Sequence, residues 1–327
     1  MRNFFRMVCW CAWLGSGAVL SSESVVRMGH PPLAGMLTDS GAGSPVVLLI
    51  PGSGPTDHDG NSPLGVSAQP YRLLAQALAA HHISVVRVDK RGLFLSRSAS
   101  TDPNRVTMGM YAKDVIDWAA RLSQSRHVHC VWVLGHSEGS QVAMLAARTD
   151  PRNICGLILV SAPGRPGWAV LTEQLHERLL ATGHASDIPS TDAAIEALRD
   201  GQPVQAETIP AAIRPLFRTD VQAFLIDWFR YDPPTDLAAS SLPTLVIEGS
   251  ADQQVEVADG SLLSHAREGV QLRVVEHMNH VWKASSGDAR ADLATYRRDD
   301  LPIVPELAEA IVVFIRSHAA QSTTTTR

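Results

Sequence analysis

Short apolar runs alternate with longer amphipathic stretches from residue 45 to residue 164 and again from residue 242 to residue 318. The runs at 45–50, 128–135 and 156–161 are apolar on both faces and rich in β-branched residues, which predicts fully buried strands. Further strands are expected at 84–89, 243–248 and 272–276, separated by stretches with helical periodicity. This order predicts an α/β fold with a mostly parallel sheet flanked by helices.

One segment interrupts the alternation. Between residues 165 and 241 we find helical patterns but no convincing strand. An insertion at this place would form a helical cap over the carboxyl ends of the strands, where open α/β sheets bind ligands. Its larger apolar side chains either line an apolar ligand pocket or pack into the helices; they are Trp168, Leu171, Leu175, Phe217, Phe224, Trp228 and Phe229. The predicted core therefore comprises residues 30–164 and 242–318, followed by a disordered tail at 319–327.

The first 22 residues have the layout of a signal peptide. Arg2 and Arg6 precede an apolar stretch that ends at Leu20, and small and polar residues follow. The stretch is too short for a confident membrane span, so no stable membrane insertion is expected after its removal. We expect a periplasmic or secreted protein; the alternative is a cytoplasmic protein with an ill-ordered leader.

Charge and cysteine content narrow the function classes. The net charge is −5 and no long basic run occurs, so a nucleic-acid partner is not expected. Beyond the leader the chain has Cys130 and Cys155, each at the start of an apolar run, and we expect buried thiols rather than a disulfide. No motif with metal-ligand spacing is present, so neither a metal nor another cofactor is expected. The oligomeric state cannot be inferred from the sequence.

The pentapeptide Gly135–Gly139 fits the pattern G-x-S-x-G, with Ser137 at its centre. A strongly apolar strand leads into it and a helix-forming stretch follows. A serine on such a tight strand-to-helix turn is held in a strained conformation that exposes its hydroxyl. The helix N-terminus also places its dipole beside the serine. These features predict that Ser137 is a catalytic nucleophile.

Two backbone N–H groups are candidates for an oxyanion hole. One belongs to Glu138, the residue after the nucleophile, and the other to Ser53 in the loop that follows the first predicted strand. Gly52 and Gly54 on either side of Ser53 let the backbone approach a substrate oxygen closely.

The nucleophile also needs a base, and the base needs an acid that orients it. Asp252 lies in the turn after the strand at 243–248, whereas Glu256 and Asp259 fall on the following helix. His280 lies in the loop after the last strand, whereas His277 is still close to strand register. We therefore predict the triad Ser137, Asp252 and His280, in the order typical of strand–turn–helix nucleophiles.

Several motifs together resemble a bacterial branch of the α/β-hydrolases. The loop Pro51–Asn61 resembles G-S-G-P-T-D-R-D-G-N, and Asp89–Gly92 resembles D-K-R-G. Further matches follow in order at 135–139, 228–233, 249–255 and 279–281. The resemblance spans about residues 45–315 and implies the α/β-hydrolase fold. Members of this branch are described as carboxylesterases or as serine-aminopeptidase-like proteins.

Two positions depart from that pattern. His58 stands where the family usually has Arg, and Phe94 replaces a Gly. Both loops are expected near the site entrance, so we include these two residues, with Gly52, Gly54 and Trp228, among the candidate substrate-binding residues. Asp57, His58 and Asp59 are consecutive and cannot easily face one ion, so we expect them to pin the loop by local hydrogen bonds.

The motifs favour a serine hydrolase that cleaves carboxylic esters of small to medium acyl chains, with a small-molecule ester as its partner. An aminopeptidase is the first alternative, and Glu138 or Glu173 would then have to hold the substrate ammonium. The second alternative is a binding protein on a hydrolase fold, which would typically lack part of the triad.

Overall fold

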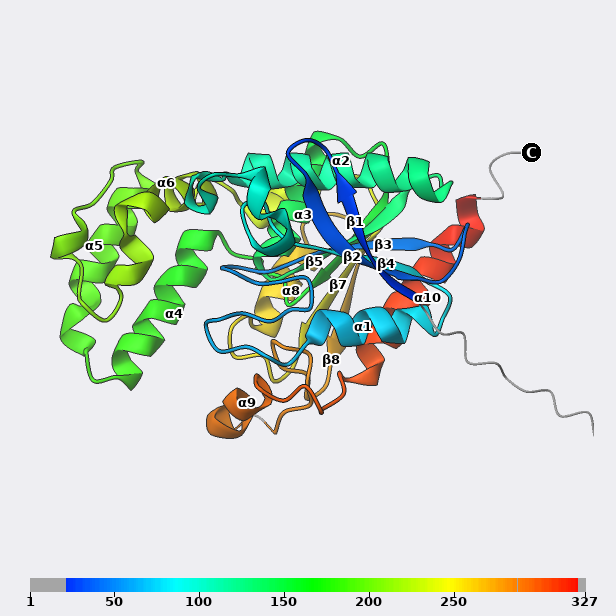
Figure 1. Cartoon of the computed structure of the whole chain (residues 1–327). Coiled ribbons are helices and arrows are strands. Elements are labelled where there is room, and N and C mark those ends of the chain that lie inside the picture. Colours follow the sequence, from blue (N-terminus) through cyan, green and yellow to red (C-terminus); the bar gives the residue numbers. More distant parts are fainter. Residues whose placement is uncertain (1–21, 287, 323–327) are drawn as a thin grey trace, which may run out of the picture.

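The computed structural model describes residues 22–286 and 288–322, and it contains one eight-stranded sheet (Figure 1). The strand order is β1-β2-β4-β3-β5-β6-β7-β8, with β2 antiparallel to both of its neighbours and parallel pairing from β4 to β8. The strands are β1 (Ser22–Met28), β2 (Leu33–Asp39), β3 (Val46–Ile50), β4 (Ser84–Val88), β5 (Val131–His136), β6 (Ile154–Val160), β7 (Thr244–Gly249) and β8 (Val270–Val275).

The central strands are apolar on both faces because each face has its own helical layer. In β3, Val46, Leu48 and Ile50 belong to one hydrophobic cluster, while Val47 and Leu49 belong to another. This alternation follows from the two-residue period of a strand. The predicted buried strands therefore match the observed sheet from β3 to β8.

Helices cover both faces of the sheet. Helices α2 and α3 pack on one face of the sheet, and helices α1 and α10 pack on the opposite face (Figure 1). The helices of the core are α1 (Pro70–Ala79), α2 (Met108–Arg126), α3 (Glu138–Thr149), α7 (Pro233–Ala238), α8 (Val257–Ser264), α9 (Ala289–Thr295) and α10 (Pro305–Ser322). Because α10 extends to Ser322, the first residues of the predicted disordered tail are helical; residues 323–327 lie outside the described part.

The hairpin of β1 and β2 was not predicted, and it extends the core upstream of residue 30. Its strand β1 is largely exposed, so the sequence lacks the continuous apolar run that marks the central strands. Arg87 of β4 explains why the hairpin is firmly attached: its buried guanidinium pairs with Glu23 of β1 and with Asp59. The predicted signal peptide lies almost wholly in residues 1–21, outside the described residues.

The segment 165–241 folds as helices with a hydrophobic core of its own. It contains α4 (Gly167–Ala181), α5 (Ile188–Arg199) and α6 (Thr219–Trp228), which lie together at one end of the molecule (Figure 1). The helical pattern at 210–231 does not form one continuous helix, since Arg218 has the extended value ψ 145° just before α6. Leu175, Phe217 and Phe229 are buried in the cap's own core, whereas Trp168, Leu171, Phe224 and Trp228 are partly buried against it.

Cys130 and Cys155 form a disulfide, so the expectation of free thiols was wrong. The two residues precede or begin the adjacent strands β5 and β6, and their Cα atoms are 5.1 Å apart. That separation suits a disulfide. The parallel pairing of β5 with β6 brings the two cysteines together, and the cysteine spacing alone does not reveal that pairing.

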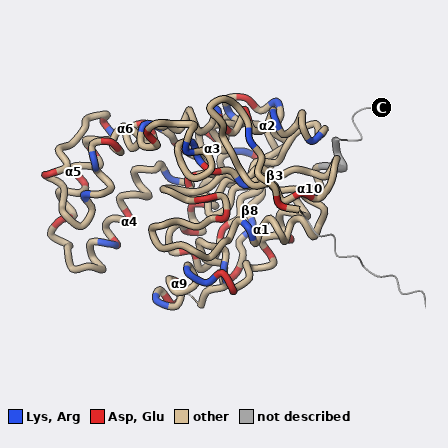
Figure 2. Tube along the Cα trace, viewed as in Figure 1, with Lys and Arg blue, Asp and Glu red and all other residues tan. Residues whose placement is uncertain are grey.

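Charges of both signs are interspersed along the described chain (Figure 2). Within residues 22–286 and 288–322, none of the helices combines the length and hydropathy that a membrane span needs.

Candidate active site

Ser137 lies on a sharp turn between β5 and α3, with φ 53° and ψ −125°. Its backbone N–H donates to the Val160 carbonyl of β6 (3.0 Å). A Cβ on Gly135 would lie 2.4 Å from the Gly139 carbonyl oxygen, and a Cβ on Gly139 would lie 2.4 Å from that of Ile50. The pentapeptide needs glycine at both ends because only glycine lets these backbones approach so closely.

The loop after β3 lies directly against this turn. A Cβ on Gly52 would be 3.2 Å from the Cβ of Ser137. Ser53 and Gly54 follow as exposed residues, and Gly54 has φ 70°. Glu138 is the first residue of α3, where a backbone N–H has no partner within the helix. The two candidate N–H donors are thus in segments that both adjoin Ser137.

His280 and Asp252 form a hydrogen-bonded pair at the carboxyl end of the sheet. His280 Nδ1 is 2.9 Å from Asp252 Oδ2, and the side chain of Asp252 is fully buried. Asp252 Oδ1 accepts hydrogen bonds from the backbone N–H groups of Gln254 (2.8 Å) and Val255 (3.1 Å). Burial acts to raise the pKa of Asp252, but His280 and the two N–H donors outweigh it and hold the pKa below its usual value. The carboxylate is therefore positioned to orient the imidazole and stabilise its charged form.

The competing residues are engaged elsewhere. Asp259 binds Arg165 and the backbone N–H of Gly164 (3.0 Å). His277 is exposed, and its backbone N–H donates to Ser250 Oγ (2.8 Å). Glu256 is exposed at the position before α8. The geometry therefore brings Asp252 together with His280.

A directional hydrogen-bond chain joins the loop after β3 to the loop that carries His280. His136 Nε2 lies 3.0 Å from the His280 carbonyl oxygen, which can only accept, so Nε2 carries the proton. Burial, followed by the charge of His280, lowers the pKa of His136 to about 3, so the ring is neutral. Its Nδ1 then accepts from the Tyr71 hydroxyl (2.7 Å), and the Tyr71 oxygen accepts from Gly52 N–H (3.2 Å).

Asn279 anchors the His280 loop to α9. Its side-chain nitrogen donates to Asp292 Oδ1 and to Thr295 Oγ1 (2.7 Å each), and its Oδ1 accepts from Lys283 N–H (2.9 Å). All these contacts are buried. Both the nitrogen and the oxygen of the Asn279 side-chain amide thus have partners, which fixes the residue directly before His280.

The consecutive residues Asp57, His58 and Asp59 point to different partners. Asp57 Oδ1 accepts from Asp59 N–H (2.9 Å) and from Asn61 N–H (2.8 Å), the local bonding expected from the sequence. The His58 ring binds Asp89, and that hydrogen bond is the main reason why the pKa of His58 is raised. Asp59 pairs with Arg87.

Phe94 and Trp228 occupy different environments. Phe94 is 38% exposed and has φ 43° at the start of a short 3₁₀ helix, close in sequence to Asp89. Trp228 donates from Nε1 to Gln141 Oε1 (2.7 Å) and packs on Gly167, where a Cβ would lie 2.3 Å from its ring. Trp228 therefore joins the cap to α3, and its role in binding a substrate stays a prediction.

The sequence analysis missed several buried polar residues around Ser137. Tyr71, Lys90 and Asn279 were seen only as parts of helical or family motifs, and His136 only as a variable position of the pentapeptide. Their roles depend on contacts between segments that are distant in sequence. The position of His136 beside the nucleophile was the one signal that could have marked it.

Comparisons with known proteins identify the fold. A family model described as serine aminopeptidase, S33, matches residues 64–282. No curated protein matches the chain. Est1E from Butyrivibrio proteoclasticus is 15% identical with a TM-score of 0.56, covering 92% of this chain and 100% of that chain. A thermophilic esterase from Thermogutta terrifontis is 19% identical with a TM-score of 0.53, covering 91% and 99%. A dienelactone hydrolase from Anabaena variabilis is 15% identical with a TM-score of 0.51, covering 91% and 98%.

Proposed function

Since the chain belongs to the serine aminopeptidase S33 family of α/β-hydrolases, we propose that it is a serine esterase for carboxylic esters of small to medium acyl chains. The observation that carries the proposal is the buried Asp252–His280 pair (2.9 Å) at the same edge of the sheet as the strained Ser137. A nucleophile, a base and an orienting acid on adjacent loops are what acyl transfer requires.

The reaction follows from these positions. His280 takes the proton of Ser137 as the hydroxyl attacks the ester carbonyl, and Asp252 stabilises the imidazolium that forms. The N–H groups of Ser53 and Glu138 bind the oxyanion of the tetrahedral intermediate. His280 returns the proton to the leaving alcohol, and water releases the acyl group from Ser137 by the same steps.

The environment of the acidic residues favours an ester over a peptide substrate. An aminopeptidase needs a carboxylate to hold the substrate ammonium. Glu138 is buried and pairs with Lys90 (3.3 Å), while Glu173 pairs with Arg165 (2.9 Å). Glu138 therefore already has a buried counter-charge, and Glu173 shares Arg165 with Asp259.

The test is turnover of p-nitrophenyl acetate and butyrate by the purified protein. Ser137→Ala should abolish turnover with its melting temperature unchanged. Ser190→Ala, at an exposed position in the first turn of α5, is the matched control and should retain wild-type rates. Unchanged turnover in Ser137→Ala would overturn the assignment. A wild type that cleaves aminoacyl p-nitroanilides faster than esters would favour the aminopeptidase, and failure to react with a fluorophosphonate probe would favour a binding protein.

Phe94 supports a proposal about acyl preference. Its exposed ring follows the Asp89–Gly92 turn, and the same Asp89 binds His58 and the backbone N–H of Leu95 (3.0 Å). We expect Phe94→Gly, the usual family residue, to shift the preferred acyl length in a panel of p-nitrophenyl esters. Identical profiles for the two proteins would remove Phe94 from the substrate-binding residues.

We also propose that the protein is exported to an oxidising compartment. The leader-like N-terminus and the Cys130–Cys155 disulfide both support this location, because stable disulfides are typical of secreted and periplasmic proteins. Cell fractionation with N-terminal sequencing tests it, and an intact N-terminus in the cytoplasmic fraction would contradict it.

A further inference from the structure

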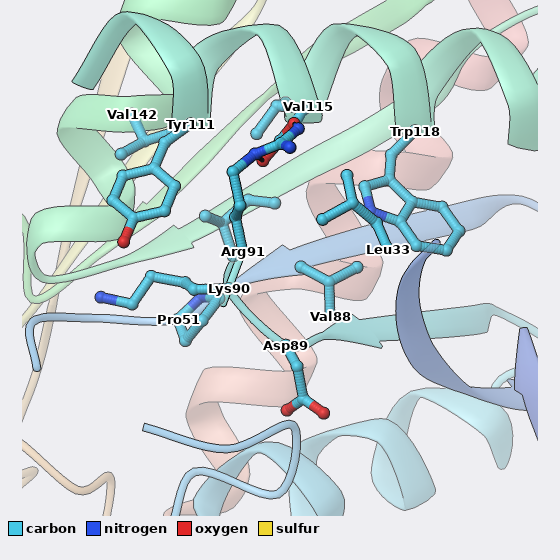
Figure 3. Close-up of a pocket in the computed structure, with 12 residues that line it drawn as sticks. Leu33, Pro51, Val88, Asp89, Lys90, Arg91, Tyr111, Val115, Trp118 and Val142 are labelled. Atoms are coloured by element: carbon cyan, nitrogen blue, oxygen red, sulfur yellow. Dashed lines mark hydrogen bonds and ion pairs between the residues drawn. The ribbon is translucent and has the colours of Figure 1, made fainter. Parts of the chain in front are cut away.

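Lys90 is a buried cation that lies beside the proposed nucleophile. It follows β4, and its side chain is 7% exposed. Its Nζ donates to the Gly52 carbonyl oxygen (2.8 Å) and to Glu138 Oε1 (3.3 Å), and it lies 5.5 Å from the ring centroid of Tyr111. In Figure 3, the Lys90 side chain extends to the same side as the Tyr111 hydroxyl, whereas Arg91 turns back towards α2.

The bond to Gly52 fixes the orientation of one peptide group. In a planar trans peptide, the carbonyl of one residue and the N–H of the next point in opposite directions. Because the Gly52 carbonyl points at Lys90, the N–H of Ser53 points away from Lys90. A flipped peptide would face the ammonium with an N–H donor and would turn a carbonyl oxygen to the opposite side. Lys90 therefore favours one of the two orientations.

The preceding peptide group is fixed as well. Gly52 N–H donates to the Tyr71 hydroxyl (3.2 Å), which is itself bonded to His136. Gly52 thus has partners on both its N–H and its carbonyl, and both bonds are buried. Little freedom remains for this residue beside Ser137.

The same ammonium also reaches the second proposed donor. Glu138 supplies a backbone N–H to the oxyanion, and its side chain is the counter-charge of Lys90. A buried ion pair is often no more stabilising than apolar residues of similar size. The Lys90–Glu138 pair, however, connects the two segments that carry the proposed oxyanion donors. Apolar residues could not make this connection.

We propose that Lys90 is a positioning residue that holds the Gly52–Ser53 peptide with its N–H directed to the oxyanion. This inference rests on the proposed function, since the oxyanion exists only if Ser137 attacks a carbonyl. Lys90 acts through Gly52 and Glu138. Its effect is therefore expected in the tetrahedral intermediate and not in the binding of the ester.

The test compares Lys90→Met with the wild type and with Lys113→Met, an exposed lysine of α2 that pairs with Asp117. Lys90→Met should lower kcat for p-nitrophenyl acetate by about 10–10²-fold, which does not exceed the usual rate loss for removing one oxyanion donor. KM should change less than about threefold. A trifluoromethyl ketone binds serine hydrolases as a hemiketal oxyanion, so its affinity should fall by the same factor. Lys113→Met should match the wild type in all three quantities.

Two results would overturn the proposal. One is a folded Lys90→Met with wild-type kcat. The other is a lowered kcat with unchanged ketone affinity, the result expected if Lys90 has only a structural role. If Lys90→Met does not fold, Lys90→Arg provides the same comparison, since it keeps the charge but displaces the donor. Its kcat and ketone affinity should again fall together, and a fall in one alone would contradict the proposal. A wild type that neither cleaves esters nor binds the ketone would overturn the proposed function itself.

Discussion

Ser137 and Phe217 lie in two regions that are held in place by different interactions. Around Ser137, buried polar bonds join segments from β3, β4, β5 and the His280 loop. Around Phe217, the cap helices are held by an apolar cluster of their own. A polar network fixes atoms to within a hydrogen bond's tolerance, whereas an apolar core tolerates repacking.

Several hydrogen bonds join the cap to the core, and most of them are partly buried. Trp228 donates to Gln141 of α3 (2.7 Å), and Asp227 accepts from the backbone N–H of Met108 (2.8 Å). Asn104 donates to Asp220 (2.8 Å), and Gln174 donates to the Gln254 carbonyl (3.3 Å). None of these contacts involves Ser137, Asp252 or His280. We therefore expect a change inside the apolar core of the cap to leave the proposed reacting groups in place.

The largest expected effect is that of Asp252→Asn at the sheet edge. The amide oxygen can still accept from Gln254 and Val255, but its NH₂ faces His280 Nδ1 and favours the wrong tautomer. We expect kcat to fall by about 10³–10⁴-fold with little change in melting temperature. Steady-state kinetics check this, with Asp117→Asn on exposed α2 as the control. A loss below tenfold would mean that catalysis does not depend on the orientation of His280 by Asp252.

Phe217→Ala tests the cap side of the comparison. Removing a fully buried phenyl ring should cost about 3–5 kcal/mol in the free energy of unfolding. We expect kcat for p-nitrophenyl acetate to stay within about threefold of wild type, because the cap core does not hold the triad. Urea unfolding and kinetics check both values, and Leu216→Ala, which removes a 40% exposed side chain, is the control. A parallel collapse of kcat would break the distinction between the regions.

Gly139→Ala should displace the backbone of the turn that carries Ser137. The added Cβ would meet the carbonyl oxygens of Ile50 (2.4 Å) and Pro51 (2.6 Å), so the elbow must move. We expect a loss of about 1–3 kcal/mol in stability together with reduced turnover. Gly109→Ala on α2 is the control. Its Cβ would meet only Thr107 Oγ1, at an ordinary contact distance of 3.9 Å, and up to about 1 kcal/mol of stabilisation is expected. Equal effects at the two glycines would contradict close packing at the elbow.

The smallest effect concerns His58, whose pKa is raised chiefly by its hydrogen bond to Asp89. Since the folded pKa exceeds the unfolded value of about 6.5, the protonated ring stabilises the fold below that pH. This contribution is lost as the pH rises through the folded pKa. His58→Arg stays charged, so its advantage over wild type should grow from pH 6 to pH 9 by less than about 1 kcal/mol.

Urea unfolding at pH 6 and pH 9 measures that difference for His58→Arg. The exposed His129→Arg is the control and should show no such growth. If the two variants respond alike to pH, the His58–Asp89 pair does not contribute to stability.

The strands from β3 to β7 could be predicted because both of their faces are buried, which leaves continuous apolar runs in the sequence. The edge strand β8 is partly exposed, and the short apolar run at its end was enough to predict it. The hairpin of β1 and β2 could not be predicted, since β1 is mostly exposed and β2 joins the sheet by pairing with the distant strand β4. The residues predicted for the site are those that a turn or a strand end marks in the sequence. Ser137, Asp252 and His280 are all of this kind.

Other site residues have no local signal. Lys90 lies 38 positions from Gly52 and Tyr71 lies 65 positions from His136, and only the folded sheet brings each pair together. The same reason explains the error at Cys130 and Cys155, which pair because β5 and β6 are neighbours. Sequence spacing describes one segment at a time, while these contacts are properties of two.

The pairing of Arg87 with Glu23 has a consequence for proteolytic maturation. The guanidinium is fully buried, and its counter-charges come from Glu23 and Asp59. A chain trimmed beyond residue 23 would leave this cation with Asp59 alone. The cost should be below the loss of about 3–5 kcal/mol that breaking a fully buried pair causes, because the Glu23 side chain is itself 31% exposed. Trimming that stops before Glu23 would therefore keep both counter-charges of Arg87.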